Sequence, residues 1–491
     1  MRCHITFLFA SSILFLVSFP TNGQQSNTFY LMHQVPQSNL LNPAVQLQCK
    51  WFVGIPGLTS SHLSYSNTAF TYNDLAGSNS WNLDGVVDQM HRVDLITAEA
   101  MIHPISIGYR FRSLYFTFNI TEKGHAYQTV PKRFAEMALY GNGRFLGETS
   151  RFNALRPAGY YQREYSLGVS KVMDNSLILG LRGKLLFGKV NLYGNQLKAD
   201  FTTRETDFNV FLNGDFTINS SFPLTIYQDG EGNISDITMD EIDLLQMLMN
   251  RGNPGFAMDF GAIYRVDERI TLSASLLDVG VVRWRTDLNN VSGVGSFEYG
   301  GVDPSTTIVS VGFIEEIIDS LIHAFDITVA QEPYFSILPA QLFLGGTYQL
   351  KKNITLGVVN RNVIFRRKIH SSLTLSANAD LAERLLATVS WSYLNNSIKN
   401  IGAGFAYHGK GFQFHVVSDN LLGFFYPFDT RTVNLRAGFN VMLGCPRNNK
   451  EKQDAESYGR MPKGGDCSWT GKPKKRKKQM HKVLRKQNNI H

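Results

Sequence analysis

The sequence predicts an all-β protein, an antiparallel transmembrane β-barrel of roughly 14 strands with short helices in its connections. Three observations predict this fold. Segments of about ten residues alternate between apolar and polar side chains, as strands with one lipid face and one lumen face do. A secretory leader precedes them. Charged residues make up only 18% of the chain and aromatic residues 12%, which favours a barrel over the alternative, a secreted soluble β-sandwich protein.

The leader spans residues 1–23. Arg2 precedes an apolar run over residues 5–19, and Gly23 supplies the small residue expected at a signal-peptide cleavage site. This run is shorter than the roughly 20 residues of a transmembrane helix, so an uncleaved anchor is the weaker alternative. Because no run of about 18 apolar residues follows the leader, membrane crossing must rest on strands.

Residues 24–50 are predicted to form an N-terminal strap or plug, because they are polar, turn-rich and too irregular for a strand. The candidate plug motif within them is Asn42, Pro43 and Ala44. Strand-like alternation begins directly afterwards, and we expect the barrel to occupy residues 51–444.

The clearest alternation lies in two strands over residues 105–111 and 114–121, which a tight turn joins. Further along the chain, Leu181 and its apolar neighbours share one parity, whereas Arg182 and Lys184 lie on the other. Charged residues on the inward parity predict a hydrated lumen rather than a dry core.

The last part of the barrel is predicted to be an up-and-down meander, because turn signals recur at intervals of about 10 to 15 residues. Within it, Val389 and Trp391 are assigned to lipid and Ser390 to the lumen. Asp419 and the following Asn420 are assigned to a loop.

Short helices are expected in the connections at residues 86–90, 130–140, 239–250 and 310–324. Three acidic residues exclude the last of these as a membrane-spanning helix. We expect the three longer helices to pack across the periplasmic mouth or inside the lumen.

Residues 445–491 form a basic tail. Of the chain's net charge of +8, this tail carries fourteen Lys or Arg against four Asp or Glu, which is +10 and leaves −2 for the rest. Behind a leader, nuclear import or nucleic-acid binding does not fit, so we expect contact with anionic lipid headgroups or an acidic partner. A solvated tail without a partner is the alternative. The candidate contact residues are Lys474, Lys475, Arg476, Lys477 and Lys478.

Cys49, Cys445 and Cys467 remain once the leader, with its own cysteine, has left. Their spacing does not suit a zinc site. In an oxidising compartment Cys445 and Cys467 are the expected disulfide pair, and free thiols are the alternative.

The sequence contains no catalytic signature: it lacks the nucleophile elbow, the zinc-protease motif, the phosphate-binding loop and the dinucleotide fingerprint. The 12 histidines are scattered singly. We therefore expect no enzyme activity, no cofactor and no metal.

Two motifs carry a resemblance to known families. Leu41-Asn42-Pro43-Ala44 followed by Ile55-Pro56-Gly57-Leu58 resembles the start of an uncharacterised outer-membrane barrel family of the Bacteroidota, a domain of unknown function. That family is distantly similar to the PorP/SprF barrels of type IX secretion and gliding. The resemblance covers residues 30–443. The triplet Asn42, Pro43 and Ala44 also resembles the N-terminal hatch of FadL-type barrels, which pass hydrophobic molecules.

The resemblance implies a non-enzymatic barrel of the bacterial outer membrane, either structural or associated with secretion, with its tail in the periplasm. The alternative function is a channel or transporter for hydrophobic or small solutes. The expected partners are outer-membrane lipid, an envelope or secretion protein, and a hydrophobic ligand.

Overall fold

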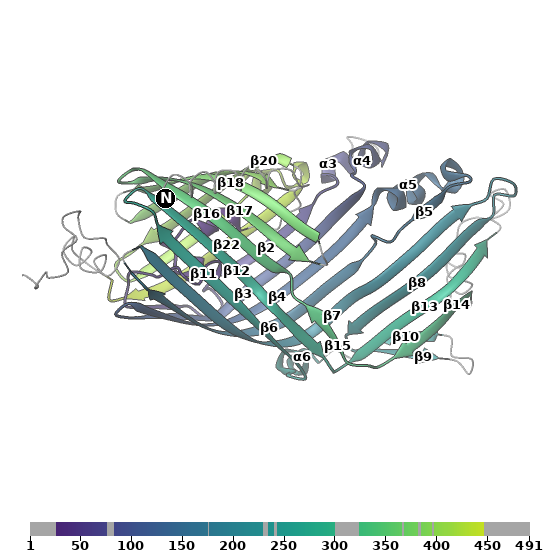
Figure 1. Cartoon of the computed structure of the whole chain (residues 1–491), viewed down its shortest axis with the longest axis horizontal. Helices are drawn as coiled ribbons and strands as arrows, with labels where there is room; N and C mark the ends of the chain where they lie inside the picture. Colours follow the sequence, from purple (N-terminus) through teal and green to yellow (C-terminus); the bar gives the residue numbers. More distant parts are fainter. Residues whose placement is uncertain are drawn as a thin grey trace, which may run out of the picture.

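The chain folds into a closed barrel that continues on one side as a curved sheet (Figure 1). The computed structural model describes residues 26–75, 83–174, 176–228, 234–239, 243–299, 324–365, 368–381, 384–394 and 397–445. Fourteen antiparallel strand positions form a closed ring, since the first strand pairs with both its neighbour and the last strand. The predicted all-β fold and number of strands are therefore confirmed.

The ring is formed by long antiparallel strands joined mostly in sequence order. In ring order they are β1 (Trp51–Gly54), β3 (Val93–Phe111), β4 (Leu114–Pro131), β6 (Pro157–Val172), β7 (Leu177–Thr203), β11 (Asn253–Arg265), β12 (Ile270–Trp284), β16 (Ala340–Lys351), β17 (Ile354–Phe365), β18 (Lys368–Leu381), β19 (Leu385–Leu394), β20 (Ser397–His408), β21 (Phe412–Ser418) and β22 (Thr432–Leu443). β2 (Ser61–Asn67) continues the position of β1 between β3 and β22.

The side chains of the ring alternate between an apolar outside and a polar inside. On β19, Val389 is 60% exposed and Trp391 is 40% exposed, whereas Ser390 is buried. Arg182 and Lys184 also lie inside and are buried. The parity predicted from the sequence is therefore confirmed, because an outward-facing apolar row is what lipid requires.

The curved sheet beyond the ring, which we call the wing, exists because β7 is 27 residues long and changes partner along its length. Residues 177–188 of β7 pair with β11, and residues 191–203 pair with β8 (Val210–Ser221). The wing comprises this second part of β7 and the strands β5 (Thr149–Arg151), β8, β13 (Leu288–Tyr299) and β14 (Phe325–Ala330).

Two smaller strand elements border the wing. β9 (Leu224–Gln228) and β10 (Ile234–Met239) form a separate hairpin, and β15 (Tyr334–Ile337) pairs with the end of β12. We call this end of the barrel the wing end. The opposite end, where β3 turns tightly into β4 and where β22 finishes, is the turn end.

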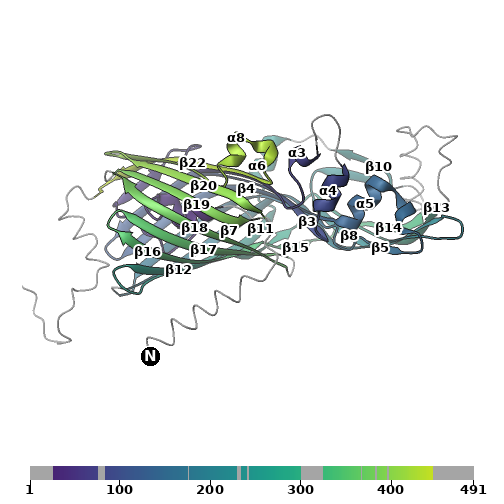
Figure 2. The same ribbon diagram turned by 90° about the horizontal axis from the view of Figure 1, so that it is seen from above.

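The described helices are short and lie at the wing end or in the lumen (Figure 2). They are α2 (Asn27–Tyr30), η2 (Pro36–Leu40), α3 (Tyr72–Leu75), α4 (Leu83–Gln89), α5 (Lys132–Tyr140), η3 (Asn142–Phe145), α6 (Leu244–Met249), α8 (Leu422–Phe425) and η4 (Pro427–Asp429). None of the described helices is long and apolar enough to cross a membrane.

The helices expected at residues 86–90, 130–140 and 239–250 correspond to α4, α5 and α6, although α6 is shorter because β10 occupies residues up to 239. Residues 310–323 lie outside the described part of the chain. Neither α5 nor α6 lies in the lumen, which was one of the two expected locations. β3 and β4 are 19 and 18 residues long, so the connection that carries α5 emerges beyond the ring, whereas α6 projects from the wall.

The assignment of side chains to the lipid face and the lumen face can be tested on β19. Val389→Arg is expected to destabilise the barrel by about 2 to 4 kcal/mol if this residue lies near the bilayer midplane, because its outward position would place a charge in lipid. Ser390→Arg, on the inward parity, should cost much less. Urea-dependent refolding into vesicles measures both, and equal losses would show that the assignment of the two faces is wrong.

Candidate functional site

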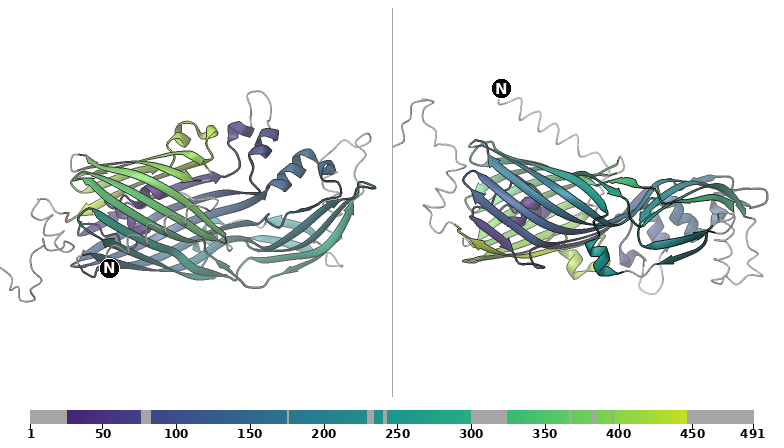
Figure 3. Two further views of the ribbon diagram at one scale, coloured as in Figure 1. Left: turned by 45° about the horizontal axis from the view of Figure 1, so that its top comes forward. Right: turned by 90° about the horizontal axis from the view of Figure 1, so that it is seen from below.

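Residues 26–47 lie inside the ring and form what we call the plug, the purple segment within the barrel in Figure 3. The plug contains no Asp, Glu, Lys or Arg, so the fixed charges of the lumen belong to the wall. Its apolar side chains and those of the wall form one buried cluster, made of Phe29, Tyr30, Leu31, Met32, Val35 and Leu41 from the plug and Leu277, Phe343, Val359, Leu386, Ala406 and Val417 from the wall.

The first turn of the plug is held by hydrogen bonds to two strands of the wall, β18 and β19, and to Asp419, which directly follows β21. The backbone N–H of Thr28 donates to Asp419 Oδ1 at 2.7 Å, and the Thr28 hydroxyl lies 2.6 Å from that of Ser390. The Asn27 amide donates to the hydroxyls of Ser372 and Thr374 at 2.9 and 3.0 Å. Because all six residues are buried, each of these hydrogen bonds replaces one to water that the closed lumen excludes.

The triplet of Asn42, Pro43 and Ala44 lies against β7 and β11. Asn42 Oδ1 accepts the N–H of Ala44 at 2.9 Å, which forms a local turn. Its amide nitrogen donates to the hydroxyl of Tyr30 at 3.2 Å, within the plug. The backbone comes so close to the wall that a Cβ at Gly180 would collide with Pro43, and one at Gly261 would collide with the Asn42 side chain. These two wall positions must therefore be glycine for the turn to lie there.

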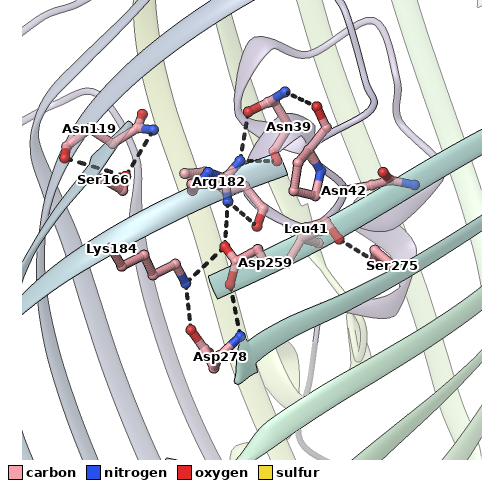
Figure 4. A network of polar contacts seen from close by, with 12 residues as sticks. Asn39, Leu41, Asn42, Asn119, Ser166, Arg182, Lys184, Asp259, Ser275 and Asp278 are labelled. Atoms are coloured by element: carbon pink, nitrogen blue, oxygen red, sulfur yellow. Dashed lines mark hydrogen bonds and ion pairs between the residues drawn. The ribbon is translucent and has the colours of Figure 1, made fainter. Parts of the chain in front are cut away.

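A network of buried ion pairs joins five strands of the wall beside the plug (Figure 4). Lys123 of β4 lies 2.8 Å from the carboxylate of Asp278 on β12, which also pairs with Lys184 of β7. Lys184 and Arg182 each lie 3.0 Å from Asp259 on β11. The side chains of all five residues are at most 9% exposed. Glu164 of β6 lies 3.7 Å from Lys184 and supplies a third carboxylate, so that three positive charges meet three negative charges, as burial requires.

Arg182 connects this network to the plug. Its guanidinium donates to the carbonyl oxygen of Leu40 at 3.1 Å and to the side-chain oxygen of Asn39 at 2.7 Å, as well as to the Asn39 carbonyl. Hydrogen bonds from a charged donor are roughly twice as strong as neutral ones. The wall therefore holds the middle of the plug by the same residue that anchors the ion pairs.

Two further guanidiniums reach the lumen. Arg436 donates to the hydroxyls of Ser26 and Ser60 at 3.1 and 3.4 Å, and Arg361 donates to Gln341 Oε1 at 2.8 Å. Beside them lies a cavity of about 50 Å³, bounded by the plug and by inward side chains of the wall. Its charged lining residues are Glu99, Lys123, Glu164, Arg182, Lys184, Asp278, Arg361 and Arg436.

A smaller apolar pocket of about 10 Å³ lies next to this cavity on the wing side. Leu95, Tyr127 and Phe365, which line it, follow the cavity residues Glu99, Lys123 and Arg361 along the inward faces of β3, β4 and β17. From the wing side toward the middle of the lumen, the inward side chains of these strands therefore change from apolar to charged.

Cys445 is paired with Cys49 in the structure, so the expected pair of Cys445 and Cys467 is wrong. The partners are 396 residues apart in sequence, yet they flank the first and last strands of the ring, where Trp51 pairs with Leu443. Closure of the barrel thus brings together two cysteines that the sequence separates. Cys467 lies outside the described residues.

The polybasic segment at residues 474–478 also lies outside the described residues. Asp419 immediately follows β21, as the expected loop requires, but sequence reasoning missed its contact with the plug. It also missed the pairing of Asp259 and Asp278 with the charges on β7, because these carboxylates come from distant strands. In the described part of the chain, no three His, Cys, Asp or Glu side chains gather as a metal site would need.

Comparisons with known proteins relate the chain to barrels. No curated protein matches it. Among solved structures, the toluene transporter TbuX of Ralstonia pickettii is 11% identical with a TM-score of 0.37, covering 87% of this chain and 97% of that chain. A FadL homologue of Pseudomonas aeruginosa is 11% identical with a TM-score of 0.36, covering 86% and 98%. Likenesses this distant say nothing about what this chain carries. The model of a family of unknown function, DUF5723, matches residues 43–419, most of the chain, and the chain therefore belongs to that family.

Proposed function

We propose that the protein is a transport barrel of the bacterial outer membrane, closed by its plug, that passes hydrophobic or small amphipathic solutes. The observation that carries this proposal is the lumen. An apolar pocket and a charged cavity follow one another from the wing end, and the charged cavity borders a plug without charged side chains. A solute with an apolar body and a polar group would complement both spaces in that order.

The plug fills the ring, and the cavity beside it holds only a few water molecules, since one water needs about 10 to 15 Å³. Passage therefore requires the plug to move. The leader predicted from the sequence would deliver the chain to the periplasm, which supports a periplasmic turn end and a periplasmic location of the basic tail.

The proposal is tested by fixing the plug to the wall. In a Cys467→Ser background, we exchange Thr28 and Ser390 for cysteine, because their hydroxyls lie only 2.6 Å apart across the boundary between plug and wall. Oxidation of this variant is expected to abolish uptake of decanoate by cells that produce the barrel, because the plug can no longer move.

The matched control joins two strands of the wing and leaves the contacts between plug and wall unchanged. The hydroxyls of Thr149 and Thr202 lie 2.9 Å apart on β5 and β7, so the cysteine pair replaces two hydroxyl residues at a similar separation. Uptake by the oxidised control should match that of the wild type. If both oxidised variants transport equally well, plug movement is not part of the function.

The wing favours a second candidate, a barrel that associates with an envelope or secretion protein. It extends a sheet beyond the ring, and the residues of β8 between Val210 and Ser220 are half-buried or exposed on both faces. Purification in mild detergent from native membranes should then recover a partner with the intact protein. A variant whose β7–β8 turn at residues 204–209 carries a bulky insertion should lose it, and equal recovery would exclude the wing tip as the contact.

A further inference from the structure

α6 presents an apolar surface that no described part of the protein covers. Leu244 is 59% exposed, Leu245 is 73% exposed and Met249 is 60% exposed. No residue of this helix is buried. Because such a cluster in water is unfavourable, it indicates a surface that another apolar phase covers.

The protein holds α6 firmly in this orientation. At the N-terminus of the helix, Asp243 Oδ1 accepts the N–H groups of Leu245 and Gln246 at 2.9 and 3.2 Å. After its last turn, the ammonium group of Lys189 on β7 donates to the carbonyl of Asn250, whose amide donates to Thr286 at 3.1 Å. Both ends of α6 are therefore fixed, and these hydrogen bonds keep its apolar side chains pointing outward.

α6 lies at the wing-side limit of the lipid-facing surface of the ring. On the outward face of β12, Val279 and Val281 are 43% and 41% exposed, and the next two outward residues are Arg283 and Arg285, both exposed. Apolar side chains toward the turn end and arginines toward the wing end are what a strand presents where acyl chains give way to headgroups.

The neighbouring strands change at the same height. Arg163 of β6 pairs in register with Phe187 of β7, which pairs with Pro254 of β11. Arg283 of β12 pairs with Phe335 of β15, which is 62% exposed. α6 ends four residues before β11 begins, and the helix lies beside the wing-side ends of these strands (Figure 1).

We propose that α6 is a membrane-interface helix that docks on the leaflet at the wing side, with Leu244, Leu245 and Met249 among the acyl chains. Arg283 and Arg285 then face the lipid phosphates. Amphipathic helices of this kind lie in the plane of the interface with their apolar side buried in lipid. The occupant is lipid rather than protein because α6 ends four residues before β11, whose Phe256 and Phe260 are 53% and 44% exposed on the lipid-facing surface of the ring. The wing beyond this row stands outside the membrane.

The test measures the depth of α6 in vesicles that contain only lipid, independently of transport. In a Cys467→Ser background, spin labels are attached at Leu245→Cys, at Val281→Cys in the lipid-facing surface and at Val294→Cys on the wing. Val294 is 61% exposed but pairs with Asp215 and Asp326, so it serves as an apolar position that faces water. The reconstituted protein is probed with oxygen, which concentrates in lipid, and with a water-soluble nickel chelate.

The ratio of oxygen to nickel accessibility is expected to be several-fold higher at position 245 than at position 294, and closer to that at position 281. All three residues are exposed, so labelling leaves the fold intact. A difference in gel mobility between heated and unheated samples that equals that of the unlabelled protein confirms this. A ratio at position 245 equal to that at position 294 would overturn the proposal, because α6 would then face water and its apolar surface would belong to a protein partner.

Discussion

Replacing Asp278 with asparagine is expected to lower the free energy of unfolding by about 3 to 5 kcal/mol, because it leaves buried lysines without their carboxylate. Lys123 lies 2.8 Å from Asp278 and has its ion pair there, whereas Lys184 keeps Asp259 at 3.0 Å. Asparagine is the informative replacement, since Asp278 has a φ of 59° and asparagine tolerates this left-handed conformation. The loss therefore reports charge and not backbone strain. This loss is measured by urea titration of the folded barrel, in which the folded fraction is read from the mobility of unheated samples on gels.

The matched control is Asp215→Asn on the wing. Lys198 lies 2.8 Å from Asp215, the same separation as in the buried pair, but the two side chains are 62% and 36% exposed. Solvent screens such a pair, so the expected loss is at most about 1 kcal/mol. If the two substitutions have equal effects, the lumen is accessible enough to water to screen the network.

Removal of the disulfide by Cys49→Ser is expected to lower the free energy of unfolding by up to about 5 kcal/mol, the upper end of the range for disulfides. The reason is the length of the chain that the disulfide closes, since its partners are 396 positions apart in the sequence. Closing a longer loop removes more conformational entropy from the unfolded chain. The same urea titration measures the change.

Cys467→Ser is the control for this substitution, because it removes a cysteine but leaves Cys49 and Cys445 paired. Its unfolding curve should coincide with that of the wild type. The prediction fails if reduced and oxidised wild-type protein unfold at the same urea concentration, since the bond would then constrain nothing in the unfolded state.

The sequence alone determined the fold class and the two faces of the barrel. Alternation has a period of two residues, so the exposure of Val389 and the burial of Ser390 follow from neighbouring positions without knowledge of the partner strands. The irregular, polar start of the chain likewise indicated a segment that does not join the wall. These features are local, and local sequence is sufficient to encode them.

Only the tertiary structure decided which distant groups meet. The cysteine pairing expected from proximity in sequence was wrong, because closure of the ring places Cys49 beside Cys445. A register shift between β11 and β12 brings Asp278 toward Lys123 and Lys184, and no single strand contains that information. The wing depends on the change of partner along β7, from β11 to β8. Such pairings are selected by the free energy of the whole closed sheet, to which residues from many strands contribute, and so they do not appear in the pattern of any one segment.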